Sequence, residues 1–253
     1  MKKPKIAIYG FTGCSGCQLE ILDLEEVLLD IFNLVEIVNF EMAGIKKRPL
    51  PRVDVSFVEG SISKKEDIKK LKEIREKSKI VIAMGACACF GGVQGIRNFV
   101  DSKEAARAAY GIDDCPRGST EKISGVDEYV KVDYYLPGCP IDRKEFLQLI
   151  KKIILGRKLK PQTYPLCVEC KRKGIVCLLD RGILCLGPIV RAGCGALCPS
   201  LNRGCEGCRG MVIDANLMEQ IEIMKKMKFS REEIIRKLRI FAANQFKEVE
   251  KYL

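Results

Sequence analysis

The sequence predicts an α/β protein: a flavodoxin-like parallel sheet, followed by an irregular, cysteine-rich region that ends in helices. Two observations support this fold. From residue 1 to about residue 156, short apolar runs alternate with segments of helical periodicity, as in chains that place helices on both faces of a sheet. Beyond that point cysteine, glycine and proline replace the alternating pattern. We therefore expect two domains, residues 1–158 and residues 159–253.

Five apolar runs of strand length lie in the first part. Four of them are followed at once, or after one residue, by glycine or a Pro-Gly pair, which is typical of a buried strand that ends in a tight turn. We expect strands at residues 5–10, 34–40, 53–58, 79–84 and 130–136. Residues 44–52 predict a loop, because they include four basic residues and two prolines, and residues 90–128 show no clear pattern.

Helices are expected between these strands and after the cysteine-rich segment. Ser63 and Glu66 have the spacing of a capping box, and Asp142 with Glu145 gives a second capping signal. Ser230 should cap the last helix in the same way. The predicted helices are residues 18–32, 63–77, 142–155, about 211–227 and 231–252.

Composition excludes several classes of function. No run approaches the roughly 18 apolar residues needed to cross a bilayer, and no apolar signal segment precedes the first strand, so we expect a cytoplasmic protein without membrane contact. The absence of histidine excludes His-based acid–base catalysis, Ser–His triads and mixed Cys/His metal sites. The formal charge of +11 is spread along the chain, and aromatic residues are not interleaved with the basic ones, which favours a solvated surface or an acidic protein partner over nucleic acid.

Eight of the fourteen cysteines lie within residues 167–208, among glycines and prolines that interrupt helices. Because bulky apolar side chains are scarce there, bonds between thiolates and metal are expected to organise the segment. Iron–sulfur clusters, zinc and disulfides all fit these residues, although nothing indicates an oxidising compartment. The cysteines divide into two sets of four, namely Cys167, Cys170, Cys177 and Cys185, and Cys194, Cys198, Cys205 and Cys208.

A further set of cysteines follows three predicted strands: Cys14 and Cys17, then Cys87, then Cys139. The carboxyl ends of parallel strands share one edge of a sheet, so these four side chains are expected to meet in space. The alternative is that Cys87 and Cys139 are small buried residues, but both stand in glycine-rich segments that we expect to be loops. Cys89 and Cys115 are left, and we expect them to be unliganded thiols; the alternative is that Cys89 replaces Cys87 as a ligand. The GxxGxxG spacing of the first loop is not a nucleotide fingerprint, and no Walker lysine follows it.

Together these motifs resemble the small, electron-transferring subunit of nickel–iron hydrogenases over essentially the whole chain. The resemblance is closest to the cytoplasmic multi-subunit enzymes of archaea, the sulfhydrogenases (delta subunit) and the viologen- or F420-reducing hydrogenases. It is carried by Gly13-Cys14-Ser15-Gly16-Cys17, Gly85-Ala86-Cys87-Ala88, Gly91-Gly92-Val93-Gln94, Pro137-Gly138-Cys139-Pro140, Cys185-Leu186-Gly187-Pro188, Cys194 and Cys205-Glu206-Gly207-Cys208.

The resemblance implies a linear relay of three [4Fe-4S] clusters and no catalytic side chains. A proximal cluster would use Cys14, Cys17, Cys87 and Cys139, near a Ni–Fe centre held by a separate large subunit. A medial cluster would use Cys194, Cys198, Cys205 and Cys208. A distal cluster would use Cys167, Cys170, Cys177 and Cys185, where a further iron–sulfur or flavin subunit would dock.

Two departures from exported members of that family matter. Their distal cluster has one histidine ligand, whereas Cys167 stands at that position here, and their medial cluster often has three irons, whereas Cys198 offers a fourth thiolate. The expected function is electron transfer in H2 oxidation or proton reduction, with NADP or polysulfide as acceptor. The alternatives are a chain linked to F420 or to heterodisulfide reductase, a relay subunit of a quinone-linked complex, and a zinc-stabilised interaction module.

Overall fold

A computed structural model describes residues 3–112 and 119–253 of the chain. Its main element is a parallel sheet with the strand order β2-β1-β3-β5-β7, which is the flavodoxin-like order. All four strand pairings are parallel, with Ile8 opposite Phe57 and Phe57 opposite Ile82. The predicted α/β class is therefore confirmed. The strands are β1 Lys5–Gly10, β2 Glu36–Phe40, β3 Val53–Glu59, β5 Ser78–Met84 and β7 Tyr134–Leu136.

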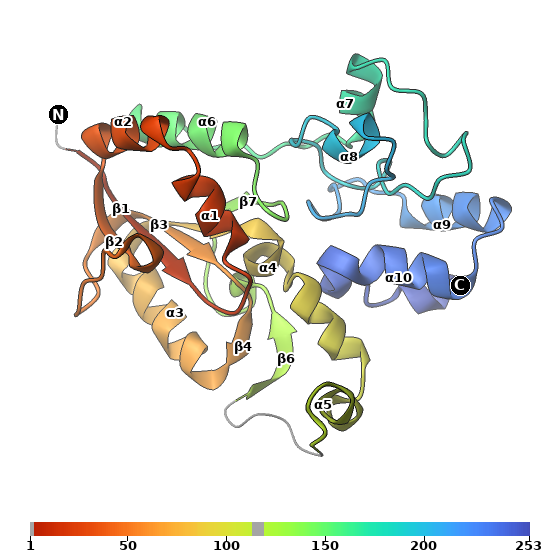
Figure 1. Cartoon of the computed structure of the whole chain (residues 1–253), viewed down its shortest axis with the longest axis horizontal. Helices are drawn as coiled ribbons and strands as arrows, with labels where there is room; N and C mark the ends of the chain where they lie inside the picture. The colour runs from red at the N-terminus through yellow and green to blue at the C-terminus, as the bar shows by residue number, and fades with distance from the viewer. Residues whose placement is uncertain (1–2, 113–118) are drawn as a thin grey trace.

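Helices cover both faces of this sheet, as Figure 1 shows for α2 and α6 on one side and α3 on the other. Because successive strand residues point to opposite faces, Phe57 packs with Phe146 of α6 at a ring distance of 5.4 Å, while Val58 joins the cluster that contains Leu71 of α3. The helices concerned are α1 Gly16–Leu22, α2 Glu26–Leu34, α3 Lys65–Lys77, α4 Gly85–Phe90 and α6 Arg143–Ile154.

Two local predictions in this half are wrong. The single helix expected at residues 18–32 is two helices, α1 and α2, because Glu25 between them has a positive φ of 49° that no α-helix accommodates. The capping box expected at Ser63 does not form: the N-cap is Lys64, whose N–H donates to the carboxylate of Asp67 at 3.1 Å. The hydroxyl of Ser63 instead hydrogen-bonds that of Thr12, far away in sequence.

The predicted strand at residues 130–136 is shorter than expected, and the described part of residues 90–128, where the sequence showed no clear pattern, contains further elements. The last strand begins at Tyr134 instead of residue 130, and a two-stranded antiparallel sheet joins β4 to β6 beside the main sheet. Asp133, next to the last strand, accepts a bond from the Val81 N–H at 2.8 Å and pairs with Arg75. The additional elements are β4 Ile62–Lys64, β6 Ser119–Ser124, α5 Ser102–Tyr110 and the 3-10 helices η1 Glu41–Ala43, η2 Val93–Phe99 and η3 Val126–Glu128.

The cysteine-rich segment contains only two short helices, as its glycines and prolines predict, and two longer helices follow it. The capping box at Ser230 is confirmed: the Glu233 N–H donates to the Ser230 hydroxyl at 3.2 Å, and the Ser230 N–H donates to the Glu233 carboxylate at 2.8 Å. The last predicted helix ends earlier than expected, at Ala242, and continues as 3-10 turns. These elements are α7 Cys167–Arg172, α8 Leu197–Ser200, α9 Leu217–Lys226, α10 Arg231–Ala242, η4 Ala243–Phe246 and η5 Val249–Tyr252.

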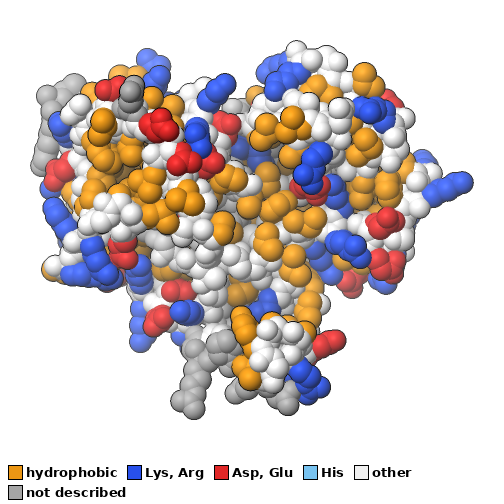
Figure 2. Space-filling model, viewed as in Figure 1, with side chains coloured by type: hydrophobic (Ala, Val, Ile, Leu, Met, Phe, Trp, Pro, Cys, Tyr) orange, Lys and Arg blue, Asp and Glu red, His pale blue; other side chains and the backbone are white. Residues whose placement is uncertain are grey.

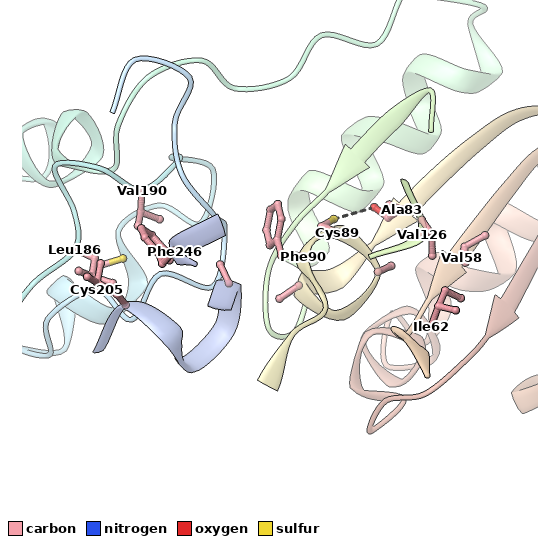
Figure 3. Close-up of a cluster of buried hydrophobic side chains, with 14 of the residues drawn as sticks. Val58, Ile62, Ala83, Cys89, Phe90, Val126, Leu186, Val190, Cys205 and Phe246 are labelled. Carbon is pink, nitrogen blue, oxygen red and sulfur yellow. Dashed lines mark hydrogen bonds between the residues drawn. The ribbon is translucent and has the colours of Figure 1, made fainter. Parts of the chain in front are cut away.

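The two halves of the chain share one buried cluster of hydrophobic side chains. Figure 3 shows Val58 and Phe90 from the first half in the same cluster as Leu186 and Phe246 from the second. The division at residue 158 stays a prediction, but the cluster fixes the cysteine-rich segment against the sheet. In the part of the chain that the structure describes, no helix is both long enough and apolar enough to span a bilayer.

Candidate metal centres

The first candidate site lies at the carboxyl edge of the main sheet. Cys14 and Cys17 follow β1, Cys87 follows β5 and Cys139 follows β7, so the sheet brings together cysteines that are far apart in sequence. The expectation that Cys87 stands in a loop is wrong, because it lies in helix α4, which starts directly at the end of β5. Cys17 likewise lies in α1.

Burial and neighbouring thiols raise the pKa values of Cys17 and Cys87 at this edge. Burial raises the pKa of Cys17 strongly, and Cys87 and Cys139 contribute in the same direction. Burial, followed by the Cys139 and Cys14 thiolates, raises the pKa of Cys87 to about 11. Such a group holds thiolates at neutral pH only when a cation compensates them, and soft metal ions do this best.

Small residues leave room for a bulky group at this edge. A Cβ added to Gly85 would lie 2.5 Å from the Cys17 sulfur, and one added to Gly92 would lie 2.5 Å from the Cys87 sulfur. Both glycines also have positive φ, of 84° for Gly85 and 62° for Gly92, which only glycine adopts without strain. The donor set and the bare backbone therefore fit an inorganic cluster held by four thiolates.

Glu59 is a polar residue of this site that the sequence pattern did not single out. It ends the apolar strand β3, is 5% exposed, and accepts a bond from the Cys17 N–H at 3.0 Å and another from the Gln18 side chain. The carboxylate is, after burial, the next cause of the raised Cys17 pKa. The sequence signal that could have identified Glu59 is an acidic residue at the end of a buried strand.

The set from Cys167 to Cys185 surrounds a cavity of about 80 Å³. Cys167 and Cys170 come from α7, and the walls between the thiols are apolar side chains such as Ile175 and Leu178. Burial, with Cys185, Cys170 and Cys177 as further causes, raises the pKa of Cys167 to about 11. Four thiols around one apolar cavity form a donor set that fits an iron–sulfur cluster.

The set from Cys194 to Cys208 is the most buried of the three. Burial raises the pKa of Cys205 far above its ordinary range. Burial and the Cys194 thiolate raise the pKa of Cys208 to about 12, and a hydrogen bond from the backbone of Cys139 opposes the shift. The pKa of Cys198, in α8, is also raised by burial and by Cys194. The four thiols therefore influence one another as a group.

The three sets lie in a fixed order. The backbone of Cys139 lies close enough to the Cys208 thiol to oppose the rise of its pKa, which places the first set beside the one at residues 194–208. The Cys205 N–H donates to the Cys185 sulfur at 3.2 Å, which links that set to the one at residues 167–185. The cysteines at residues 194–208 therefore lie between the other two sets.

Glu169, between the two cysteines of α7, also links the set at residues 167–185 to the set at residues 194–208. Its carboxylate accepts bonds from the N–H groups of Gly193 at 2.9 Å and Ala196 at 3.1 Å, on either side of Cys194. No local pattern around Glu169 signals this role, because the partners are more than twenty residues away.

Cys89 and Cys115 complete the cysteines. Cys89 is buried and its thiol donates to the carbonyl of Ala83 at 3.4 Å (Figure 3), so it faces the hydrophobic core. Cys115 lies outside the described residues. Within residues 3–112 and 119–253, no three Cys, Asp or Glu side chains converge to hold a single metal ion. A zinc ion needs its sulfurs about 2.3 Å from one point, whereas each thiolate of a four-iron cluster binds a separate iron.

Comparison with known proteins identifies the family of this protein. Residues 14–153 match the family described as NADH ubiquinone oxidoreductase, 20 Kd subunit. The chain is 41% identical over 94% of its length to the delta subunit of sulfhydrogenase 2 from Pyrococcus furiosus, of which it covers 99%. It is 36% identical over 81% of its length to the G subunit of the vhu F420-non-reducing hydrogenase from Methanocaldococcus jannaschii, of which it covers 81%.

Solved structures agree with these relatives. A chain of an NAD+-reducing [NiFe]-hydrogenase superposes with a TM-score of 0.56 at 25% identity, covering 62% of this chain and 94% of that one. A chain of an actinobacterial-type NiFe-hydrogenase from Ralstonia eutropha shares the fold over 98% of this chain and 92% of its own length, with a TM-score of 0.60 at 17% identity.

The chain belongs to the small-subunit family of [NiFe] hydrogenases, whose members are electron-transfer subunits of an oxidoreductase complex. This confirms the resemblance seen in its motifs. The family model ends at residue 153, whereas the hydrogenase relatives also match the cysteine-rich second half. That difference favours a hydrogenase over a quinone-linked complex.

Proposed function

We propose that this chain relays electrons between the Ni–Fe centre of a separate large subunit and a downstream redox subunit. Three [4Fe-4S] clusters supply one-electron redox chemistry when bound. The observation that carries the proposal is the order of the three thiol sets, which lie next to one another from the sheet edge to α7. The proposed ligands are Cys14, Cys17, Cys87 and Cys139 (proximal), Cys194, Cys198, Cys205 and Cys208 (medial), and Cys167, Cys170, Cys177 and Cys185 (distal).

The residues of this chain bind the clusters and adjust their reduction potentials. Backbone N–H groups point at the sulfurs: Gly187 and Cys205 donate to the Cys185 sulfur at 3.4 and 3.2 Å, and Gly207 to the Cys205 sulfur at 3.5 Å. Hydrogen bonds of this kind stabilise extra negative charge on a thiolate and so raise a reduction potential. Apolar side chains line the walls around the distal set.

Exposed apolar side chains mark where we propose that the large subunit docks. Leu19 follows Cys17 in α1, and Val93 and Ile96 follow Cys87 in η2; all three are exposed. Figure 2 shows hydrophobic side chains across the middle of one face, with Lys and Arg mainly toward its edges. A patch of this kind beside the proximal set suits a permanent partner.

We propose that the downstream subunit docks at the distal set, where Val176 is 66% exposed at the rim of the thiol-lined cavity. The acceptor in this proposal is NADP or polysulfide, bound by another subunit, as the resemblance of the motifs to sulfhydrogenases implies. The cytoplasmic location stays a prediction from the sequence.

Iron and acid-labile sulfide analysis of the anaerobically purified assembly tests the proposal. We expect about 12 irons per copy of this chain, from three clusters of about four irons each, after subtraction of the irons of other subunits. Brown colour, H2-dependent reduction of a viologen dye and a large subunit among the co-purified chains should accompany it. A colourless preparation containing zinc would refute the proposal, and a three-iron EPR signal in air-free protein would refute the assignment of Cys198.

A further inference from the structure

Arg209 is a buried charged residue that the relay as described does not use. Its side chain is 2% exposed and is among the largest that the described structure buries fully. A guanidinium stays protonated in proteins, so a full positive charge sits inside the molecule. Burial of a charge is unfavourable unless partners compensate it, and Arg209 has such partners on all three nitrogens.

The guanidinium makes four contacts. Its Nε donates to the carbonyl of Ala192 at 2.8 Å and its Nη1 to the carbonyl of Pro137 at 2.7 Å. Its Nη2 donates to Glu145 Oε1 at 2.9 Å, while Nη1 lies 2.8 Å from Glu145 Oε2. The pair with Glu145 is therefore a close ion pair with one hydrogen bond, from Nη2 to Oε1, while Oε2 lies near the charge without a hydrogen bond of its own among the described residues.

These contacts join two of the proposed cluster sites. Pro137 stands two residues before Cys139 of the proximal set, and Ala192 stands two residues before Cys194 of the medial set. Arg209 itself follows Cys208. One planar group thus binds the backbone of both ligand loops at once.

The backbone between these loops is shaped around the guanidinium. A Cβ added to Gly193 would lie 2.3 Å from Arg209 Nη2, and Gly193 has a φ of 122°. Only glycine allows this close approach without strain. The loop that carries Cys194 is therefore built to receive the arginine.

The ion pair is also polarised with respect to the medial set. Arg209 follows Cys208 directly and donates to the carbonyl of Ala192, two residues before Cys194. Glu145, in the first turn of α6, belongs to neither medial ligand loop. The positive end of the pair is therefore bonded to the medial ligand loops, whereas the negative end, in the described part of the chain, is bonded only to the arginine.

We propose that Arg209, paired with Glu145, is a positioning residue that fixes the proximal loop against the medial loop and raises the reduction potential of the medial site. This inference rests on the proposed function. A fixed positive charge in a medium of low dielectric favours the state with one more electron. Electrons arriving from the proximal site would then meet a medial site that accepts them readily.

The test uses the whole assembly, with EPR-monitored redox titration and iron analysis of each variant. Glu145→Gln removes the negative end and leaves both carbonyl bonds of Arg209, so the medial potential should rise. We expect the ratio of reduced to oxidised medial cluster at a fixed potential to increase about tenfold, which corresponds to about 59 mV for one electron. The double variant Arg209→Gln/Glu145→Gln removes both charges, so that ratio should instead fall below the wild-type value.

Two further variants separate position from charge. Arg209→Lys keeps the charge but cannot bind two carbonyls and a carboxylate together, so it should alter the magnetic coupling between proximal and medial clusters more than the potential. Arg143→Gln is the matched control, because Arg143 lies on the same helix as Glu145 and pairs with Glu20 and Asp23 at the surface. It should change neither quantity. The medial signal is identified as the one that Cys198→Ser alters.

The outcomes separate this inference from the proposed function. Full iron content overturns the role of Arg209 and leaves the relay intact if the medial reduction potential shifts in neither Glu145→Gln nor the double variant. Shifts of that potential with the same sign in both variants have the same meaning. Loss of iron in the double variant leaves Glu145→Gln to decide, because that change keeps the arginine bonded to Pro137 and Ala192. Absence of iron from the wild-type assembly would instead refute the proposed function.

Discussion

Replacement of Glu169 by alanine should loosen the loop that carries Cys194. The carboxylate accepts N–H bonds from Gly193 at 2.9 Å and from Ala196 at 3.1 Å. In Glu169→Ala both donors lose their partner in a partly buried position. A hydrogen bond to a charged group contributes about 1.5–3 kcal/mol to stability. Two such bonds at the lower value give about 3 kcal/mol. The free energy of local opening of residues 193–196 should fall by this amount.

Hydrogen–deuterium exchange measures this opening directly. Because about 1.36 kcal/mol is a factor of ten, about 3 kcal/mol predicts that the Gly193 and Ala196 amides exchange about 150-fold faster. Glu169→Gln, which keeps one neutral acceptor, should give an intermediate increase. Glu232→Ala, an exposed acidic residue in the first turn of α10, is the control and should change nothing at this loop.

Unchanged exchange at Gly193 and Ala196 in Glu169→Ala would refute this reasoning. An equal increase throughout strands β1 and β3 would also refute it, because that result would indicate global destabilisation instead of a local role in holding the Cys194 loop.

Three other predictions use the same assembly. Cys87→Ser should lower the iron content by about four irons per chain. Cys89→Ser should leave the iron content unchanged, because the Cys89 thiol contacts the Ala83 carbonyl in the core. Equal iron loss in the two variants would contradict the ligand assignment. Leu71→Ala, at a side chain with no exposed surface, should cost about 2–5 kcal/mol and lower the melting temperature without changing iron content. Removal of iron by a chelator should speed amide exchange at residues 194–208 far more than in β3; uniform exchange would show that metal does not organise that segment.

Several features of the sequence predicted the structure correctly because they depend on neighbouring residues. Four of the five predicted strands match β1, β2, β3 and β5 to within two residues at each end, since their apolar runs are long and end at glycine or at a turn. The caps at Asp142 and Ser230 were predictable for the same reason: the side chain bonds an N–H only three residues away. The strand before Pro137 was predicted too long.

The predictions that failed depend on contacts across the molecule. The hydroxyl of Ser63 has the spacing of a cap, but it bonds Thr12, which the fold brings beside it. The break at Glu25 interrupts a segment that the helical pattern treats as continuous. Nothing in either local pattern distinguishes these outcomes.

The sequence alone determined the strand–helix alternation, the three groups of cysteines and the absence of any histidine ligand. Local spacing specifies such features, and the rule that parallel strands share a carboxyl edge extends them to Cys14, Cys87 and Cys139. Only the tertiary structure decided that Glu59, Glu169 and Arg209 support these thiols. Each of them acts on backbone groups more than fifteen positions away, and a pairing of that length leaves no periodic trace in the chain.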